Sequence, residues 1–283
     1  MKKFFVLLLF LVIFGGGYYA YLHRDEVAEL LPTSNREETV DTFETAISPE
    51  ELLSQHSKTL LPTKQHTFGS STLHLAPHLL LQMKYSPDGR TTIATSMLWD
   101  MIDGELVLDT NSFDHTQGFA DCITSKANAD DFRILQLLTK KGALSKEQLS
   151  QELGTDNEMV CDRVENLRKR HLVIVANDIV RVHVESPLLR VDPLTTITRP
   201  FVQRKVIHKD ELQATYSKAE IEQLVKAAFG QDVAIRSSRL IFVPIYEIQV
   251  LNPDSSVRRT FWNAISGKEL WKQHTPSVIA GSR

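Results

Sequence analysis

The 283-residue sequence lacks the short motifs that identify common enzyme classes. It contains no glycine-rich phosphate loop, no HExxH metal-binding pair and no GxSxG nucleophile turn. It also lacks a large excess of charge, because 32 Lys and Arg residues nearly balance 35 Asp and Glu residues and leave a net charge of −3. This balance argues against a general nucleic-acid binder and gives no strong attraction to anionic membrane surfaces.

Cysteine is scarce, since only Cys122 and Cys161 are present. In an oxidising compartment the two could pair, and the closed loop would stabilise the fold by roughly 4 kcal/mol. Cys161 lies beside the apolar stripe of an expected helix, so a buried free thiol is the alternative. His115 precedes Cys122 by seven residues, but no third residue is identifiable that would orient such a pair for nucleophilic attack. We therefore keep Cys122–Cys161 as a candidate disulfide and predict no catalytic residue.

The amino terminus carries a long hydrophobic run. Phe4–Leu22 contains no charged residue, and as a helix it would reach about 28 Å, close to the thickness of the hydrocarbon core of a bilayer. Lys2 and Lys3 precede it, so we expect the amino terminus in the cytoplasm and the rest of the chain exported. The alternative is a cleaved signal peptide with Phe4–Phe14 as its hydrophobic region. Both interpretations place the globular part outside the cytoplasm.

The central segment, Asp130–Pro187, has the pattern of three short helices followed by a β-hairpin. Apolar residues at helical spacing predict a helix over Asp131–Lys140, and capping boxes at Ser145–Gln148 and Thr155–Glu158 predict the starts of two more. Asn177-Asp178, between two alternating stretches, predicts the hairpin turn. This layout resembles the winged helix-turn-helix family over roughly a fifth of the chain.

In that family the third helix enters the major groove of DNA and the wing touches the DNA backbone. The resemblance therefore makes five basic residues candidates for contact with a partner: Arg163, Arg168, Lys169, Arg170 and Arg181. However, Asp130–Glu185 contains nine Lys and Arg residues against ten Asp and Glu residues, so binding would release few counterions from DNA. We expect a solvated, mixed-charge helix face whose partner is a protein rather than a nucleic acid.

The segments on either side of the central segment resemble one another at a spacing of about 163 residues. Each contains a strand, a Pro-Asp turn and a second strand that ends in Trp-x-x-Ile-x-Gly, at Trp99–Gly104 and at Trp262–Gly267. Capping boxes at Ser48–Glu51 and Ser217–Glu220 predict a helix before each hairpin, over Pro49–Lys58 and over Lys218–Phe229. We predict two copies of an α+β module, similar in layout to cystatin-like or PepSY-like modules. In each copy we expect the Trp to pack on the module's own helix with its indole N–H on a carbonyl, and the Gly to have a positive φ.

Ten histidines and several acids raise the question of a metal site. His74 and His78 are spaced for a helix, but Pro77 and the β pattern make this segment extended, which places the two rings about 13 Å apart. Four acids surround an expected turn, where solvated carboxylates are common and a weak cation site is the less favoured alternative: Asp100, Asp103, Glu105 and Asp109. We predict neither a metal-ligand set nor a cofactor.

These patterns predict an α+β protein with an N-terminal transmembrane helix and two repeated antiparallel-sheet-plus-helix modules that flank a winged-helix unit. The expected boundaries are 1–22 for the anchor or signal peptide, 23–47 for a stalk, 48–125 for the first module, 126–190 for the winged-helix unit, 191–275 for the second module and 276–283 for a tail. We expect a membrane-anchored, exported protein with a non-catalytic binding or assembly role, in which the winged-helix unit docks a protein. The alternatives are a membrane-anchored transcription regulator and an enzyme without a recognisable motif.

Overall fold

The computed structural model describes residues 37–86, 90–207, 211–230 and 233–270. The chain divides into two units, residues 1–38 with 205–209 and residues 39–204 with 210–283. Little of the first unit falls within the described ranges, and almost all of the described helices and strands belong to the second unit. The expected membrane span, Phe4–Leu22, lies outside the described residues. Within them, no helix combines the length and the apolar character needed to cross a membrane.

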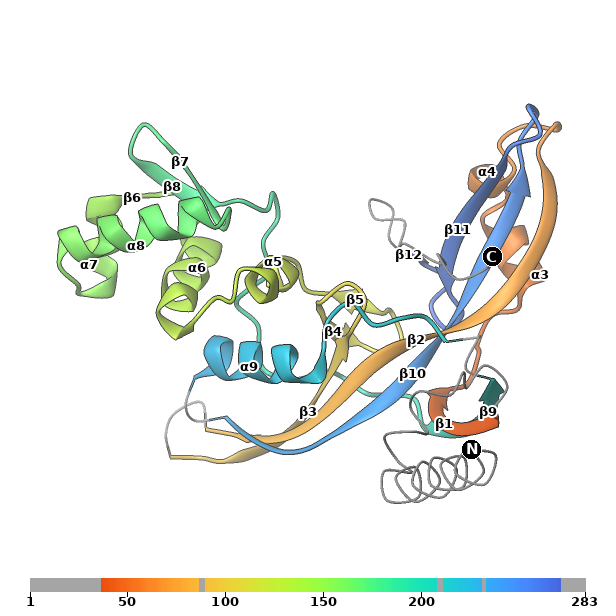
Figure 1. Ribbon diagram of the computed structural model, residues 1–283, viewed down its shortest axis with the longest axis horizontal. Coiled ribbons are helices and arrows are strands. Elements are labelled where there is room, and N and C mark those ends of the chain that lie inside the picture. Colours follow the sequence, from red (N-terminus) through yellow and green to blue (C-terminus); the bar gives the residue numbers. More distant parts are fainter. Residues whose placement is uncertain (1–36, 87–89, 208–210, 231–232, 271–283) are drawn as a thin grey trace, which may run out of the picture. The chain divides into compact units, whose positions relative to one another are not determined.

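The described residues form a mixed α+β structure of seven helices and twelve strands (Figure 1), which confirms the predicted fold class at this level. The helices are α3 (Pro49–Gln55), α4 (Ser57–Leu60), α5 (Phe119–Thr124), α6 (Ala129–Lys141), α7 (Lys146–Leu153), α8 (Asn157–Lys169) and α9 (Lys218–Phe229). The strands are β1 (Glu37–Phe43), β2 (Thr67–Tyr85), β3 (Ile93–Asp100), β4 (Leu106–Asp109), β5 (Asp114–His115), β6 (Leu144–Ser145), β7 (Val173–Ala176), β8 (Ile179–Val182), β9 (Phe201–Ile207), β10 (Ala234–Leu251), β11 (Val257–Asn263) and β12 (Glu269–Leu270).

One large sheet contains both of the expected hairpins. Its main path has the order β12-β11-β10-β2-β3-β4-β5, and its centre is the antiparallel pair β2 and β10. These two strands run side by side over their whole length (Figure 1), with Ala76 opposite Val243 near the middle. The hairpin of β2 and β3 lies on one side of this pair and the hairpin of β10 and β11 on the other.

The turns that follow β3 and β11 have the same hydrogen bonds. The side-chain oxygen of Asp100 accepts from the backbone N–H groups two and three residues further on, and the side-chain oxygen of Asn263 does the same in the second hairpin. Gly104 then has a φ of 77° and Gly267 a φ of 69°. The predicted positive φ at both glycines is therefore confirmed, and it suits a residue without a Cβ atom.

Trp99 and Trp262 are both buried, as predicted, but each packs with the helix of the other half. Trp99 belongs to a buried cluster that includes Leu224 of α9, whereas Trp262 shares its cluster with Leu52 of α3 and Leu60 of α4. The prediction that each Trp packs on the helix preceding its own hairpin is wrong. The reason is the length of β2, whose first half pairs beside the β10–β11 hairpin, so the helices that precede β2 arrive at that end of the sheet.

The helices are exchanged between the two halves, and backbone hydrogen bonds attach α9 to the turn after β3 in the same way as they attach α3 to the turn after β11. The N–H groups of Thr215 and Tyr216, directly before the N-cap of α9, both donate to the carbonyl oxygen of Met101. The N–H groups of residues 46 and 47, directly before the N-cap of α3, both donate to the carbonyl oxygen of Ala264. The contact is close, because a Cβ atom on Gly104 would lie 2.6 Å from the ring of Tyr216.

The central segment forms three helices, α6 to α8, followed by the hairpin of β7 and β8, and β6 adds to this hairpin as a third strand. The capping box at Ser145–Gln148 is present, and Asn177 and Asp178 adopt the positive φ values that a tight hairpin turn requires. The capping box predicted at Thr155–Glu158 is not formed, and the N-cap lies one residue later than predicted. Asp156 is the N-cap of α8, and its carboxylate accepts from the N–H of Glu158.

Candidate functional site

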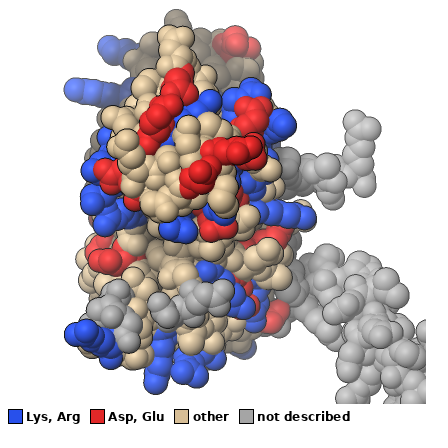
Figure 2. All heavy atoms as spheres, turned by 90° about the vertical axis from the view of Figure 1, so that its left-hand side faces the viewer, with Lys and Arg blue, Asp and Glu red and all other residues tan. Residues whose placement is uncertain are grey.

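The five basic candidates on α8, at its end and on β8 do not form a continuous basic surface. Three of them form ion pairs with acids of the same segment: Arg163 with Asp130 at 2.9 Å, Arg168 with Glu165 at 2.7 Å and Arg170 with Asp131 at 2.7 Å. Lys169 and Arg181 are exposed and form no ion pair with any described residue. Figure 2 shows a face on which Lys and Arg side chains (blue) are intermixed with Asp and Glu side chains (red).

The candidate disulfide is not formed, because Cys122 and Cys161 are both free in the structure. Cys122 lies on α5 and is buried in the same apolar cluster as Phe119 and Phe132, and burial raises the pKa of its thiol. Cys161 lies on α8 next to the buried Val160 and is only half-buried. The two thiols therefore belong to different surroundings, one within the core and the other at the edge of the buried stripe of α8.

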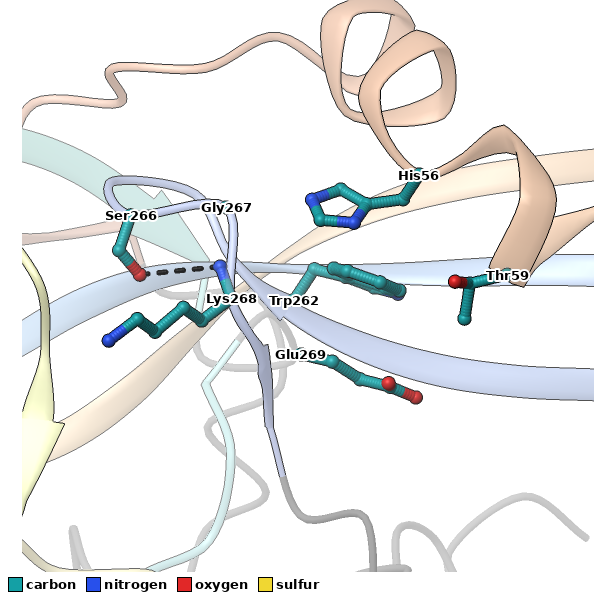
Figure 3. Close-up of a pocket in the computed structure, with 7 residues that line it drawn as sticks. All are labelled: His56, Thr59, Trp262, Ser266, Gly267, Lys268 and Glu269. Carbon is teal, nitrogen blue, oxygen red and sulfur yellow. Dashed lines mark hydrogen bonds between the residues drawn. The ribbon is translucent and has the colours of Figure 1, made fainter.

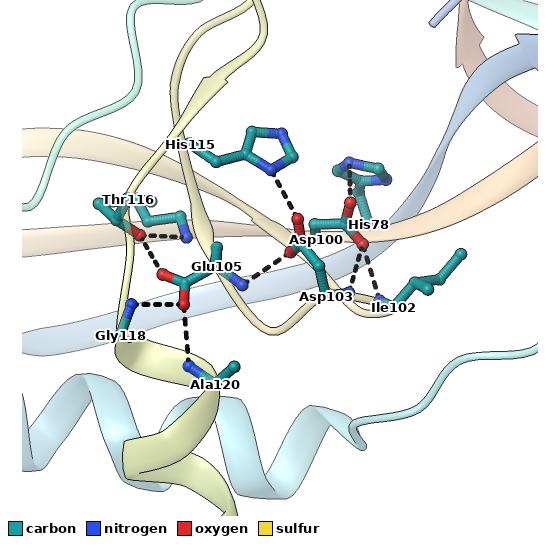
Figure 4. Close-up of polar contacts among 10 residues, drawn as sticks. His78, Asp100, Ile102, Asp103, Glu105, His115, Thr116, Gly118 and Ala120 are labelled. Carbon is teal, nitrogen blue, oxygen red and sulfur yellow. Dashed lines mark hydrogen bonds and ion pairs between the residues drawn. The ribbon is translucent and has the colours of Figure 1, made fainter. Parts of the chain in front are cut away.

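A second candidate site lies around the turn between β3 and β4, and we call its four residues, His78, Asp100, Asp103 and His115, the acid–histidine cluster. Figure 4 shows the two imidazole rings on either side of the two carboxylates. His78 on β2 and Asp100 on β3 are direct cross-strand partners, and both are almost fully buried at 2% and 3% exposure. Asp103 comes from the turn and His115 from β5, and their side chains remain 24% and 16% exposed.

His78 and Asp100 face one another without a hydrogen bond. The Nδ1 atom of His78 lies 3.0 Å from the carbonyl oxygen of Ala76, and its Nε2 atom lies 3.6 Å from Oδ2 of Asp100. Burial lowers the pKa of His78 even though the carboxylate opposes this. Burial, and next the charge of Asp103, raise the pKa of Asp100. Both shifts favour the uncharged forms of the two groups.

Asp103 and His115 form a closer pair at the partly exposed side of the cluster. Nδ1 of His115 lies 2.7 Å from Oδ2 of Asp103, which is typical of a hydrogen bond to a charged group. Burial alone would lower the pKa of His115, but the carboxylates, first of all that of Asp103, outweigh it and raise the pKa to about 9. His115 is therefore a cation at neutral pH and balances one of the two aspartates. Its Nε2 atom is buried and has no hydrogen-bond partner among the described residues.

Glu105 lies next to this cluster, and both of its carboxylate oxygens accept hydrogen bonds. Its Oε2 atom accepts from the hydroxyl of Thr116 at 2.7 Å, and its Oε1 atom accepts from the N–H groups of Gly118 and Ala120 at 2.8 and 3.1 Å. These N–H groups belong to the start of α5, whose own N-cap, Gly118, has no side chain to cap it. Burial raises the pKa of Glu105 to about 7, and the three donors oppose this rise.

The sequence pattern does not predict that the four residues of the acid–histidine cluster lie together. The acids stand out around the expected turn, but His78 and His115 are 37 residues apart in sequence and join them from separate strands. The fourth turn acid, Asp109, accepts from the backbone N–H groups of Asn111 and Ser112 and does not belong to the cluster. His74 contacts Glu247 at 3.0 Å, so the two histidines of β2 have separate partners.

A hollow of about 390 Å³ lies at the corresponding turn of the second hairpin. Figure 3 shows the ring of His56 over the indole of Trp262, with Lys268 extending away from the hollow. The ring centroids of His56 and Trp262 are 4.5 Å apart. Since Ser266 and Lys268 stand here where the first hairpin has Asp103 and Glu105, this turn lacks the converging carboxylates of the first.

Comparison of the chain with protein-family models, with curated proteins and with solved structures found no match.

Proposed function

We propose that this chain is a membrane-anchored, exported protein with a non-catalytic binding or assembly role, in which residues 126–190 form a winged-helix unit that docks another protein. The observation that carries this proposal is the state of the five basic candidates. Three of them are neutralised by acids of the same unit, while two large apolar side chains of the unit, Met159 and Ile179, are 51% and 43% exposed. Such a surface suits a protein partner better than a polyanion.

In this role the large sheet is the scaffold that carries the winged-helix unit. The side-chain amide of Gln136 on α6 donates to the carbonyl oxygen of Ala228 on α9 at 2.9 Å, and a guanidinium nitrogen of Arg170 donates to the carbonyl oxygen of Ser125 at 3.3 Å. We further infer that the two hairpins are copies of one α+β module with exchanged helices. The matched turns after β3 and β11 support this inference.

Export is tested with a pair of topology reporters fused after Arg283, one active only outside the cytoplasm and one active only inside. We expect activity from the external reporter alone, because Lys2 and Lys3 precede the hydrophobic run Phe4–Leu22. Moving positive charge to the other flank, by the changes Lys2→Glu and Lys3→Glu together with Asp25→Lys and Glu26→Lys, should shift activity toward the internal reporter. Cytoplasmic activity of the unaltered chain would refute the proposed location.

The second candidate function, a membrane-anchored transcription regulator, is favoured by one observation, the two exposed basic residues Lys169 and Arg181 that have no ion pair with a described residue. Salt-titrated binding of the full chain to duplex DNA distinguishes the two functions. We expect no measurable binding at about 50 mM salt, because a regulator needs several phosphate contacts and only Lys169 and Arg181 of the five candidates lack an ion pair with a described residue. Each phosphate contact contributes about −0.9 to the slope of log K against log salt. A steep slope that Lys169→Ala and Arg181→Ala each reduce by about one would favour the regulator instead.

A further inference from the structure

We propose that Asp100, Asp103 and His115 bind a divalent transition-metal ion, and that His78 completes the site as a fourth ligand. One potential ligand atom from each of the first three residues lies within 4.8 Å of the others. Bonds of about 2.0–2.2 Å from a tetrahedral ion to oxygen or nitrogen place its ligand atoms roughly 3–4 Å apart. Rotations of these side chains bring the three atoms around one ion, and the ion displaces the proton that His115 carries at neutral pH.

His78 gives an independent indication of a cation. A carbonyl oxygen can only accept, so the contact at 3.0 Å between Nδ1 of His78 and the carbonyl of Ala76 places the proton of the neutral ring on Nδ1. The lone pair on Nε2 then faces Oδ2 of Asp100 at 3.6 Å, and Nε2 makes no hydrogen bond with a described residue. Two such oxygen and nitrogen atoms that face one another in a buried site need either a proton or a metal ion between them. A metal ion at this point would satisfy both.

The carboxylates are already oriented for this role. Oδ1 of Asp100 accepts from the N–H groups of Ile102 and Asp103, at 2.7 and 3.3 Å, and Oδ1 of Asp103 accepts from the N–H of Glu105 at 2.9 Å. In both side chains the turn therefore occupies Oδ1 and leaves Oδ2 directed at a histidine (Figure 4). Outer hydrogen bonds that fix ligand orientation in this way are typical of protein metal sites.

The second hairpin shows that the turn does not require these side chains. Asn263 makes the same backbone contacts as Asp100, and Ser266 stands in the place of Asp103. Opposite Asn263 on the neighbouring strand is Ile245, in the position that His78 has opposite Asp100. The same turn is therefore built without any ionisable ligand, and the concentration of two acids and two histidines at the first turn needs another explanation than folding.

The ligand chemistry selects the class of ion. Two carboxylates with two imidazoles suit ions of intermediate softness, such as Zn²⁺ and Fe²⁺, whereas Mg²⁺ and Ca²⁺ prefer oxygen ligands alone. The partial exposure of Asp103 and His115, at 24% and 16%, gives an ion a route from solvent.

The test is a calorimetric titration of the full chain, purified in mild detergent without a histidine tag, with Zn²⁺ alone. We expect one tight equivalent per chain, at least 100-fold weaker binding to the Asp100→Asn variant, and none to the combined Asp100→Asn and Asp103→Ser variant. These changes install the residues of the second hairpin, so the turn should still fold, and circular dichroism checks this. Asp109→Asn is the matched control, because Asp109 also accepts from two turn N–H groups but lies outside the cluster; it should bind like the unaltered chain.

A second measurement tests whether His78 and His115 are ligands of the ion. Co²⁺ in place of Zn²⁺ gives a visible absorption band that depends on its ligands, and His78→Gln and His115→Gln should each change this band and weaken binding at least tenfold. The proposal is overturned if the unaltered chain binds no Zn²⁺, if the combined variant still binds one equivalent with unchanged affinity, or if an excess of Mg²⁺ displaces the ion. None of these outcomes depends on the proposed docking role of the winged-helix unit.

Discussion

Trp99→Ala is expected to lower the free energy of unfolding by about 3–5 kcal/mol, the range measured when large aromatic side chains are removed from protein cores. The indole of Trp99 is fully buried and meets the ring of Phe119 edge-on, with 5.3 Å between ring centroids. Its N–H group makes no hydrogen bond with a described residue, so the prediction that this N–H finds a carbonyl is wrong. The loss on substitution should therefore be almost entirely one of packing, measured by chemical denaturation.

Trp262→Ala is the matched control for the exchange of helices. Trp262 is equally buried, and its indole N–H donates to the hydroxyl of Thr260 at 2.8 Å rather than to a carbonyl. Amide hydrogen exchange should show protection lost in α9 for Trp99→Ala and in α3 for Trp262→Ala, because each helix packs on the hairpin of the other half. The reverse pattern would contradict the helix exchange, even if both variants lose the expected stability.

Glu105→Ala is expected to cost about 3–5 kcal/mol, because it leaves the hydroxyl of Thr116 and the N–H groups of Gly118 and Ala120 without their acceptor in a buried place. Glu105→Gln should cost only about 1 kcal/mol, since its amide oxygen can still accept from the two N–H groups at the start of α5. Denaturant unfolding of both variants measures the difference. Equal losses would mean that the charge of the carboxylate matters rather than its hydrogen bonds to the start of α5, because glutamine keeps both the volume and an acceptor oxygen.

The sequence predicted the local elements well because local chemistry determines them. The capping boxes at Ser48 and Ser217 are present where expected, and so are the glycines with positive φ at Gly104 and Gly267. The pairing of β2 with β10 could not be predicted in the same way. Those strands were expected in separate modules, and nothing in the period of a strand states which strand lies beside it. The exchange of helices follows from that pairing, so the sequence pattern did not predict it either.

The candidate sites show the same limit. The basic residues of α8 were found from their type and spacing, but their neutralisation depends on contacts across helices, such as that of Arg163 with Asp130 on α6. Asp100 and Asp103 were recognised as turn acids, whereas His78 and His115 come to them from β2 and β5. A local pattern identifies residues that could carry chemistry, and only the register of the sheet decides which of them meet.

The helix exchange also has a consequence for the order in which the chain is made. Leu52 on α3 packs in a cluster with Trp262, which leaves the ribosome about 200 residues later. At 5–20 residues per second this is a wait of roughly 10–40 s, during which the apolar face of α3 lacks its native partners on β10 and β11. Contacts between residues so distant in sequence also slow folding. A nascent chain that stops before β11 therefore cannot complete even the part of the fold that was synthesised first.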